Sequence, residues 1–434
     1  MLIVASVVGS GIFFTPSHVA SLLPSAGLIL LAWLVGALLS LAGAFTNAEL
    51  GSMFPHAGGD YVYLREGLHP VAGFLVGWLS FFAIYAGTIA ALAMVIAQSI
   101  ADSLGLERAG AIVIATALIL GCSVLNLRGT KIGAILNNMT SVAKIAALVI
   151  FVVLGTLVGE GSLAPWFGSE AASDLADDLG TRDGLDSWVR FGQALSPILF
   201  SYLGWNVSVY VASEIKDPAR NLPRSLFLGL GLCAVLYLLV NCIYLYALTP
   251  AELSSAGDAG EAAARKLFGP VGGTLVAGFV LISVLGTLNA TVLVGPRIVY
   301  AMALDGLVGG GTDRVHDGYQ TPGVAIIVQA VVAIGLVLFL ETFPKALNFT
   351  VFGIILATSA DTVALFSLRI RQPQRARTYR TWGYPWVPGI YLVVNLAIGT
   401  AMVVGSPQET LTTLALLAGG LLVYFGFIRN AARA

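Results

Sequence analysis

Charged side chains are scarce in this chain. Its 434 residues include 22 Lys and Arg and 23 Asp and Glu, or 10% of the sequence, against about 25% in an ordinary soluble domain. Hydrophobic residues make up 57%, and the mean hydropathy is +0.89. This composition excludes an ordinary soluble domain and predicts a polytopic membrane protein embedded in the lipid bilayer. The formal net charge of −1 says nothing about other partners, and we expect no nucleic acid among them.

Cysteine and histidine are also rare. Cys122, Cys233 and Cys242 all lie inside apolar segments, so we expect no disulfide framework. The four histidines show no metal-ligand spacing. A membrane enzyme acting on lipids would need a cluster of carboxylates or histidines at membrane depth, and the sequence offers none. We therefore expect no enzymatic activity, no metal and no cofactor.

Long apolar runs take up most of the chain instead. Segments of about 17–25 apolar residues are long enough to cross a bilayer. The sequence predicts an all-α membrane protein with twelve such spans: 2–23 (interrupted), 26–53, 71–100, 109–127, 131–158, 187–213 (interrupted), 223–248, 270–304, 322–340, 344–368, 386–405 and 410–428.

Basic residues alternate between successive connections. One set of connections is rich in Lys and Arg, most clearly between residues 369 and 380, whereas the other set is acidic, as in residues 160–186. Because basic connections stay on the cytoplasmic side, we expect both termini in the cytoplasm.

Two of the predicted spans are interrupted at glycine. Gly9-Ser10-Gly11 breaks the first span, and Gly204-Trp205-Asn206 breaks the sixth. A helix in lipid must satisfy its own backbone groups, so a break is costly unless the freed groups bind something, such as the carboxylate or ammonium of a small solute. The alternative is a small-residue face on which a neighbouring helix packs.

The two interrupted spans hold matching positions in two sets of five. Such a pair indicates an inverted-repeat transporter with its site near the bilayer midplane. The repeats would cover about residues 1–158 and 187–368 of a core at 1–368. Coincidence is the alternative, since the chain has 50 glycines. A channel would favour a continuous polar lining over two isolated breaks.

Five motifs carry a resemblance to a known family. They are GSGIFFTP (9–16), ELGSMFPHAGGDYVYLRE (49–66), GFLVGW (73–78), YLGWNVSVYVASEIKDPARNLPRS (202–225) and GTLNATVLVGPRIVYAMALDG (286–306). Together they resemble the amino acid–polyamine–organocation (APC) superfamily of permeases, and within it the bacterial relatives of L-type amino acid transporters. The resemblance implies a LeuT-type fold, with a 5+5 inverted repeat in the core and two peripheral helices at 386–428.

The resemblance also implies how the breaks bind substrate. Backbone N–H groups at Ser10, Gly11 and Ile12, with the Ser10 hydroxyl, would hold a carboxylate. Carbonyl groups of Val7, Phe200 and Leu203 would hold an ammonium group. Trp205, directly after Gly204, resembles the family's aromatic gate, and an ordinary packing role is its alternative. The carboxylate and ammonium groups of such a substrate match the partial positive and negative charges at the N- and C-termini of half-helices.

Lys144 lies in the middle of the fifth span, where a charge is costly and usually marks function. It resembles a lysine whose ammonium occupies the place of Na⁺ in sodium-coupled relatives. There it would tether the first and eighth spans through Ser283 or the carbonyls near Gly9. The resemblance implies independence from sodium, and a lysine snorkelling to the interface is the alternative.

Several other polar residues are weaker candidates for gating or the pathway: Tyr202, Asn206, Asn289 and Glu214. Asn289 would face the pathway or bond a neighbouring helix, and Glu214 would form a gating ion pair or cap a helix. The connection at 101–110 has no cysteine, although family members with a heavy-chain partner use one there. We therefore expect no heavy-chain subunit, and the oligomeric state stays open.

The combined expectation is a secondary active amino acid carrier, a permease or antiporter working by alternating access without sodium. We expect neutral α-amino acids as substrates and the plasma membrane, a bacterial inner membrane, as its location. A cationic amino acid or polyamine exchanger and a proton-coupled symporter are the alternatives.

Overall fold

The computed structural model describes residues 2–54, 58–162, 184–205, 208, 215–309, 311, 312, 314 and 321–428. Every regular element in this part of the chain is a helix. Nine of the described helices are long and apolar enough to cross a membrane. The all-helical prediction is therefore confirmed, and the apolar composition is organised into membrane-length helices.

The first half of the chain follows the predicted segments closely. The interrupted first span forms α1 (Leu2–Val7) and α2 (Gly11–Leu22), and α3 (Ala26–Met53) follows. The third predicted span is longer than expected and contains a π-helix. The elements of this part are α4 (Asp60–Gly67), α5 (Pro70–Leu79), η1 (Ser80–Tyr85), α6 (Ala86–Leu104), α7 (Arg108–Leu127) and α8 (Thr130–Leu157).

The second half is equally helical. The sixth predicted span is described as α11 (Gly184–Ser201), and residues 206, 207 and 209–214 lie outside the described part, Asn206 and Glu214 among them. The later helices are α13 (Pro218–Ala247), α14 (Pro250–Ser255), α15 (Ala259–Val294), α16 (Pro296–Leu304), α17 (Gly323–Leu340), α18 (Phe343–Arg371), α19 (Trp386–Gly405), α20 (Pro407–Val423) and η3 (Tyr424–Ile428). Gly269 kinks α15 with a φ of 77°.

Local chemistry explains several helix ends. The Ser25 side chain accepts the Leu28 N–H at the start of α3, at 3.2 Å. At the start of α14, Thr249 and Glu252 form a capping box, with Pro250 in the first turn. Each arrangement satisfies N–H groups that the helix itself leaves without acceptors. Gly105 ends α6 in the left-handed region, at a φ of 62°.

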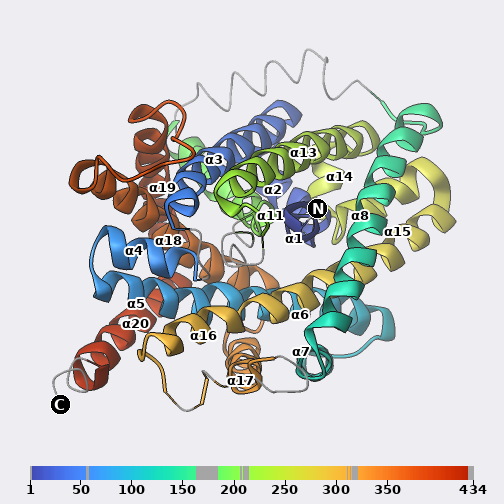
Figure 1. The fold of residues 1–434 in the computed structure, drawn as a ribbon. Coiled ribbons are helices and arrows are strands. Elements are labelled where there is room, and N and C mark those ends of the chain that lie inside the picture. Colours follow the sequence, from blue (N-terminus) through green and yellow to red (C-terminus); the bar gives the residue numbers. More distant parts are fainter. Residues whose placement is uncertain are drawn as a thin grey trace.

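The helices on either side of the breaks, α1, α2 and α11, lie inside the bundle (Figure 1). Contacts join α2 to α11 and α15, α1 to α13, and α11 to α3, while α3 and α13 pack along each other. Both interrupted segments are thereby surrounded by longer helices, which places the two breaks in the interior of the protein.

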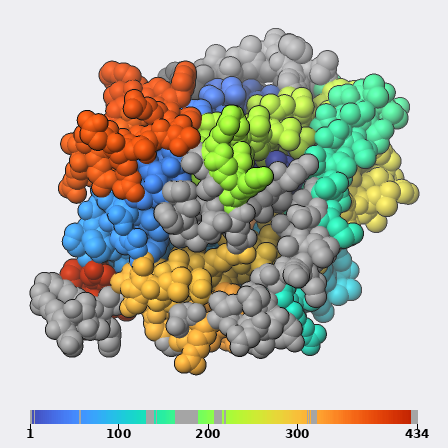
Figure 2. All heavy atoms as spheres, in the orientation of Figure 1, coloured from blue at the N-terminus to red at the C-terminus, as the bar shows by residue number. Residues whose placement is uncertain are grey.

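The outer helices expose many large apolar side chains. They include Val149, Ile150 and Val153 on α8, and Leu228, Leu232 and Val235 on α13. In Figure 2, α8 and α15 form the right-hand edge of the molecule. An apolar surface of this extent fits a protein surrounded by lipid.

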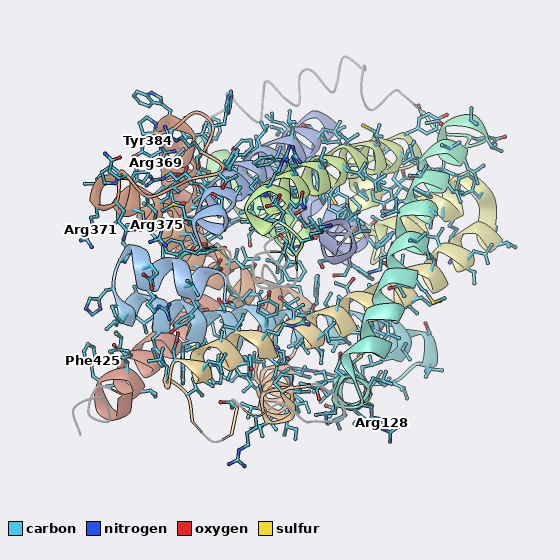
Figure 3. The ribbon with its side chains drawn as sticks, viewed as in Figure 1. Arg128, Arg369, Arg371, Arg375, Tyr384 and Phe425 are labelled. Atoms are coloured by element: carbon cyan, nitrogen blue, oxygen red, sulfur yellow. The ribbon has the colours of Figure 1, made fainter. Side chains whose placement is uncertain are left out.

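A buried ionic cluster fixes one end of the bundle. The Glu49 carboxylate on α3 is fully buried and accepts two bonds from Arg369 on α18, both at 2.7 Å. Arg377 adds a third at 3.1 Å, and the Thr381 N–H a fourth at 2.7 Å. Figure 3 shows Arg369, Arg371, Arg375 and Tyr384 gathered on the left of the molecule. The cluster ties α3 to the connection between α18 and α19.

Candidate functional site

The two helix breaks contact each other directly. A Cβ atom added at Gly11 would lie 2.4 Å from the Oγ and 2.5 Å from the Cα of Ser201. A Cβ atom at Gly204, whose φ is 112°, would lie 2.6 Å from the carbonyl oxygen of Ser6. Only glycine permits such approaches, because any other residue would place a carbon atom inside its neighbour. The start of α2 thus crosses the end of α11, and Gly204 rests on the end of α1.

The first break leaves backbone donors available. Among the described backbone bonds, the N–H groups of Phe13 and Phe14 both reach the Ser10 carbonyl, at 3.0 and 3.1 Å, but none takes the N–H of Gly11 or Ile12. The Ser10 side chain is buried, and its hydroxyl has no partner in the described part of the chain. The N-terminus of α2 therefore presents free donors where its dipole is positive.

The carbonyl groups at the breaks are partly engaged. Val7 accepts a bond from the Tyr237 hydroxyl at 2.8 Å, and Phe200 accepts one from the Leu203 N–H at 3.0 Å. A carbonyl oxygen has two lone pairs, so each keeps the capacity for one further bond to an ammonium group.

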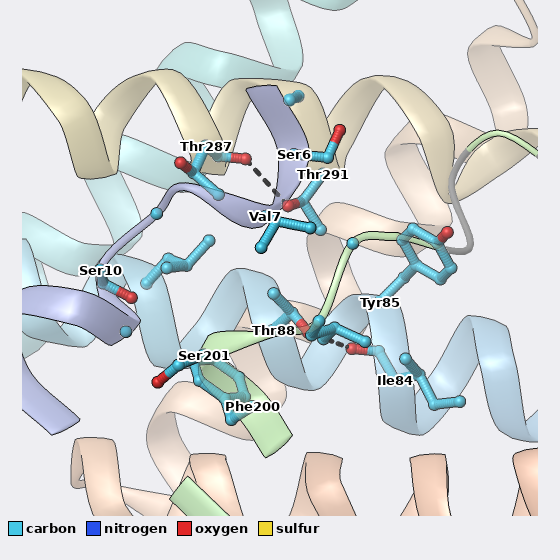
Figure 4. A pocket seen from close by; sticks show the side chains of 16 residues that line it. Ser6, Val7, Ser10, Ile84, Tyr85, Thr88, Phe200, Ser201, Thr287 and Thr291 are labelled. Atoms are coloured by element: carbon cyan, nitrogen blue, oxygen red, sulfur yellow. Dashed lines mark hydrogen bonds between the residues drawn. The ribbon is translucent and has the colours of Figure 1, made fainter. Parts of the chain in front are cut away.

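A cavity of about 60 Å³ lies between the breaks (Figure 4). Six of the residues predicted for binding line it: Val7, Ser10, Gly11, Phe200, Leu203 and Gly204. Ile12 is buried beside the cavity without lining it, and Trp205 does not line it either. The cavity thus brings the two interrupted segments together around one small space.

Two further stretches of the chain line the cavity, through residues that sequence reasoning did not name. Ile84, Tyr85, Thr88 and Leu92 come from η1 and α6, and Thr287, Ala290 and Thr291 from α15. The Thr88 hydroxyl donates to the Ile84 carbonyl at 2.6 Å, and the Thr291 hydroxyl to the Thr287 carbonyl at 2.9 Å (Figure 4). The π-helix at Ser80–Tyr85 ends on this wall, as π-helical turns at functional sites often do.

The lining is mainly apolar with several hydroxyl groups, and it carries no Asp, Glu, Lys, Arg or His among the described residues. Its hydroxyl groups come from Ser6, Ser10, Ser201, three threonines and Tyr85. Such a lining can bond a neutral polar group, whereas it offers no countercharge to a charged side chain.

Lys144 does not line the cavity but contacts Thr287, which does. Its side chain is buried, and Nζ donates to the Thr287 Oγ1 at 2.7 Å. The Thr287 hydroxyl donates to the Ser283 carbonyl at 3.2 Å, and a Cβ atom at Gly9 would lie 3.1 Å from the Thr287 methyl carbon. Thr287 therefore links the lysine to the first break, whereas the Ser283 hydroxyl, expected in this role, has no partner in the described part of the chain.

The remaining candidates lie outside the cavity. Trp205 approaches Gly43 on α3, where a Cβ atom would be 3.4 Å from its ring. Tyr202 is fully buried against the rings of Trp33 and Tyr237, with centroid distances of 6.0 and 5.2 Å. Asn289 on α15 accepts a bond from Asn126 on α7 at 2.8 Å, so it bonds a neighbouring helix.

A larger cavity of about 540 Å³ lies beside the C-terminal half of α2, lined also by α6, α14, α15 and α18. Phe14 and Phe343 line this cavity and Phe200 lines the central one, and the Phe343 ring lies 6.4 Å from Phe14 and 6.1 Å from Phe200. Asp258 lines this outer cavity, and burial raises the pKa of its carboxyl group to about 7. The outer cavity thus carries three carboxyl side chains, Asp102, Asp258 and Glu261, and ring contacts connect its wall to that of the central cavity.

Known proteins resemble this chain over almost its whole length. The family model described as "Amino acid permease" matches residues 1–427. The serine/threonine exchanger SteT of Bacillus subtilis (strain 168) is 31% identical over 436 residues, which cover 99% of this chain and 95% of SteT. The b(0,+)-type amino acid transporter 1 of Homo sapiens is 25% identical over 437 residues, covering 98% and 86% of the two chains. The large neutral amino acids transporter small subunit 2 of Homo sapiens is 26% identical over 429 residues, covering 98% and 78%.

Proposed function

Since this chain belongs to the amino acid permease family, and is therefore a multi-pass membrane transporter of the APC superfamily and not an enzyme, we propose that it exchanges small neutral α-amino acids across the membrane. The observation that carries the proposal is the contact between two helix breaks around a cavity with free backbone donors at one end.

The breaks would hold both ends of a zwitterion. Free N–H groups of Gly11 and Ile12, with the unpartnered Ser10 hydroxyl, face the carboxylate. The carbonyl groups of Val7, Phe200 and Leu203 face the ammonium. Half-helix dipoles favour this orientation, since an N-terminus attracts an anion and a C-terminus attracts a cation. Recognition by the backbone selects an α-amino acid and leaves the side chain to the rest of the cavity.

The cavity favours small neutral side chains. Its volume of about 60 Å³ is small, and its lining combines hydroxyl groups with no Asp or Glu among the described residues. A cationic amino acid or a polyamine would require such a carboxylate to pair with its buried charge. The relative SteT is named as a serine/threonine exchanger, which fits a hydroxyl-lined site. Serine, threonine and alanine are the substrates we expect.

Lys144 supports transport without sodium. Its buried ammonium lies between α8 and α15 and reaches the first break through Thr287. A positive charge fixed there would repel a bound Na⁺ by Coulomb's law. Exchange of one amino acid for another then requires no coupling ion, and proton symport is the alternative coupling.

We also propose a LeuT-type arrangement of twelve spans for the whole chain. The core would run from residue 1 to 368 as two inverted repeats, about 1–158 and 187–368, with α1/α2 and α11 in the broken positions and α19 and α20 peripheral. Both termini would lie in the cytoplasm of a bacterial cell, in the inner membrane. The protein would work without a heavy chain, because residues 101–110 contain no cysteine.

Uptake into proteoliposomes tests the function. Vesicles preloaded with L-serine should take up radiolabelled L-serine or L-threonine, while empty vesicles should take up little. Replacing external Na⁺ by choline should leave the rate unchanged. No exchange of any amino acid would refute the proposal, strict dependence on Na⁺ would refute the role given to Lys144, and preference for arginine or putrescine would indicate a cationic substrate.

A further inference from the structure

Two carboxyl groups lie side by side in the interior of the protein, away from the helix breaks. Asp361 on α18 is 1% exposed, and Asp60, the first residue of α4, is 2% exposed. The Asp60 carboxyl lies within hydrogen-bonding reach of the Asp361 carboxyl. Two ionised carboxylates repel each other at such a distance, and burial removes the water that would screen them. The pair therefore requires compensation by positive charge or by a proton.

The groups around the pair favour a proton on it. The Asn47 amide on α3 donates to Asp361 Oδ2 at 3.3 Å. The other oxygen, Asp361 Oδ1, is buried and has no partner in the described part of the chain, and the same holds for the hydroxyl of Tyr63 on α4. Tyr63 and Tyr391, the latter on α19, both lie within electrostatic reach of the two carboxyls. A protonated carboxyl can donate to a neighbouring oxygen atom, whereas an ionised one only accepts.

The charge balance leads to the same conclusion. Arg297 on α16 lies within electrostatic reach of the Tyr85 hydroxyl, as Asp60 also does. Glu49 on α3 is paired within its own ionic cluster. Arg297 can balance one of the two carboxylates of the pair, which leaves one net negative charge inside the protein, at a high cost in free energy. A single proton removes that charge.

The backbone around each carboxyl indicates which of the two holds the proton. Asp60 begins α4, so its carboxylate lies at the positive end of the helix dipole. Asp361 lies inside the long helix α18, between Phe343 and Arg371, and receives no such compensation. The proton therefore belongs on Asp361, which can donate it to the Asp60 carboxylate.

Tyr85 connects this region to the central cavity, which it lines (Figure 4). We propose that Asp60 and Asp361 form a proton-binding site, in which one shared proton holds α4 against α18 beside the central cavity. Loss of the proton leaves two like charges in contact and favours separation of the two helices. The site does not depend on which solute the cavity takes.

The test is Asp361→Asn, because an amide has nearly the shape of a protonated carboxyl and can donate the same hydrogen bond to Asp60. The matched control is Asp217→Asn, which makes the same change at an exposed, left-handed position that asparagine tolerates. Infrared spectra of the purified protein at about pH 8, where ordinary carboxyls are ionised, report the C=O band of protonated carboxyl groups. Thermal melting between about pH 6 and 9 reports the stability of each protein. Asp258 is present in all three proteins, so its contribution cancels.

Asp361→Asn should lose the infrared band of one protonated carboxyl, while the wild type and Asp217→Asn should keep it. The melting temperature of the wild type should fall relative to that of Asp361→Asn as the pH rises, since the folded pair holds a proton that the separated carboxyls of the unfolded chain release. A band that Asp361→Asn leaves unchanged, or a difference in melting temperature that does not vary with pH, would overturn the proposal.

Two outcomes in the wild type alone bear on the site without any variant. Absence of the protonated-carboxyl band at about pH 8 would overturn the proposal. A melting temperature raised at that pH by Na⁺ relative to choline would also overturn it, if Asp361→Asn removes the increase, because a metal cation would then occupy the pair. None of these measurements uses transport, so their failure leaves the proposed exchange untouched, and absence of exchange leaves the proton site untouched.

Discussion

The close crossing of the two half-helices makes Gly11→Ala the sharpest test of the site. The added methyl group would meet backbone, because its carbon would lie 2.5 Å from the Cα of Ser201, where ordinary contact begins at 3.4 Å. No side-chain rotation relieves that overlap, so α2 and α11 must separate by about 1 Å in a densely packed interior. Overpacking of this kind typically lowers the free energy of unfolding by about 1–3 kcal/mol, so we expect the variant to remain folded.

Gly11→Ala should impair substrate binding far more than it lowers the stability of the fold. The carboxylate and ammonium ends of the substrate are held by different half-helices, so a separation of about 1 Å moves one end out of hydrogen-bonding distance. A displacement of that size at a reacting centre costs about 100-fold, and we expect a comparable loss of kcat/KM for L-serine. Exchange in proteoliposomes measures the loss, and size-exclusion chromatography with thermal melting shows that the variant is folded.

Gly231→Ala on α13 is the matched control. A Cβ atom at this position meets nothing within 4 Å, and alanine is the better helix former by about 1 kcal/mol. The variant should transport normally and melt at the same or a higher temperature. A Gly11→Ala protein with the KM and rate of the wild type would refute the reasoning, because it would show that the half-helices need not touch for substrate to bind.

Three further predictions concern charged groups. Lys144→Ala should abolish exchange while lowering the melting temperature only slightly, and an equal loss of both would assign the lysine to structure alone. Glu49→Ala should destabilise the protein by about 3–5 kcal/mol, because it leaves Arg377 buried without its carboxylate. The control is Glu341→Ala, which breaks the exposed ion pair with Arg108 and should cost about 1 kcal/mol or less. Burial raises the pKa of Asp258 to about 7, so the folded state binds the proton more tightly than the unfolded state does. The resulting gain in stability is complete below about pH 4 and is lost as the pH rises through 7. Asp258→Asn keeps a good cap for α15 and should flatten the fall in melting temperature between pH 5 and 8; an unchanged slope would contradict the assignment.

The breaks could be predicted from the sequence because their chemistry is local. Gly9, Gly11 and Gly204 interrupt apolar segments, and a helix in lipid cannot lose its backbone bonds without a reason. The structure interrupts the first span at residues 8–10, as the sequence predicted, but it ends α11 at Ser201, before the predicted break at Gly204. The meeting of the breaks, which lie almost 200 residues apart, could not be predicted from spacing alone; only the family resemblance implied that both bind one substrate.

The other walls of the cavity were not predictable for a different reason. In a soluble protein, the polar face of a helix tells which side faces the core. Here the lipid-facing and core-facing sides are both apolar, so the sequence around Thr88 or Thr291 does not reveal the direction in which each points. The same ambiguity made Ser283 one of the two expected partners of Lys144, beside the carbonyls near Gly9, where the structure shows Thr287, one turn further along α15. Tyr237 was missed because a lone tyrosine in an apolar span carries no visible pattern.

The two ends of the site differ in a way that bears on exchange. At the ammonium end, the Val7 carbonyl already holds a donor from Tyr237. At the carboxylate end, the described residues supply no backbone acceptor to the N–H groups of Gly11 and Ile12. Water can bond these groups, but only an anion compensates the partial charge of the α2 N-terminus. If the half-helices move between inward and outward states, the uncompensated charge opposes their movement without substrate, and a bound carboxylate removes that opposition. On this argument the carboxylate controls the transition, so the carrier should exchange amino acids much faster than it returns empty.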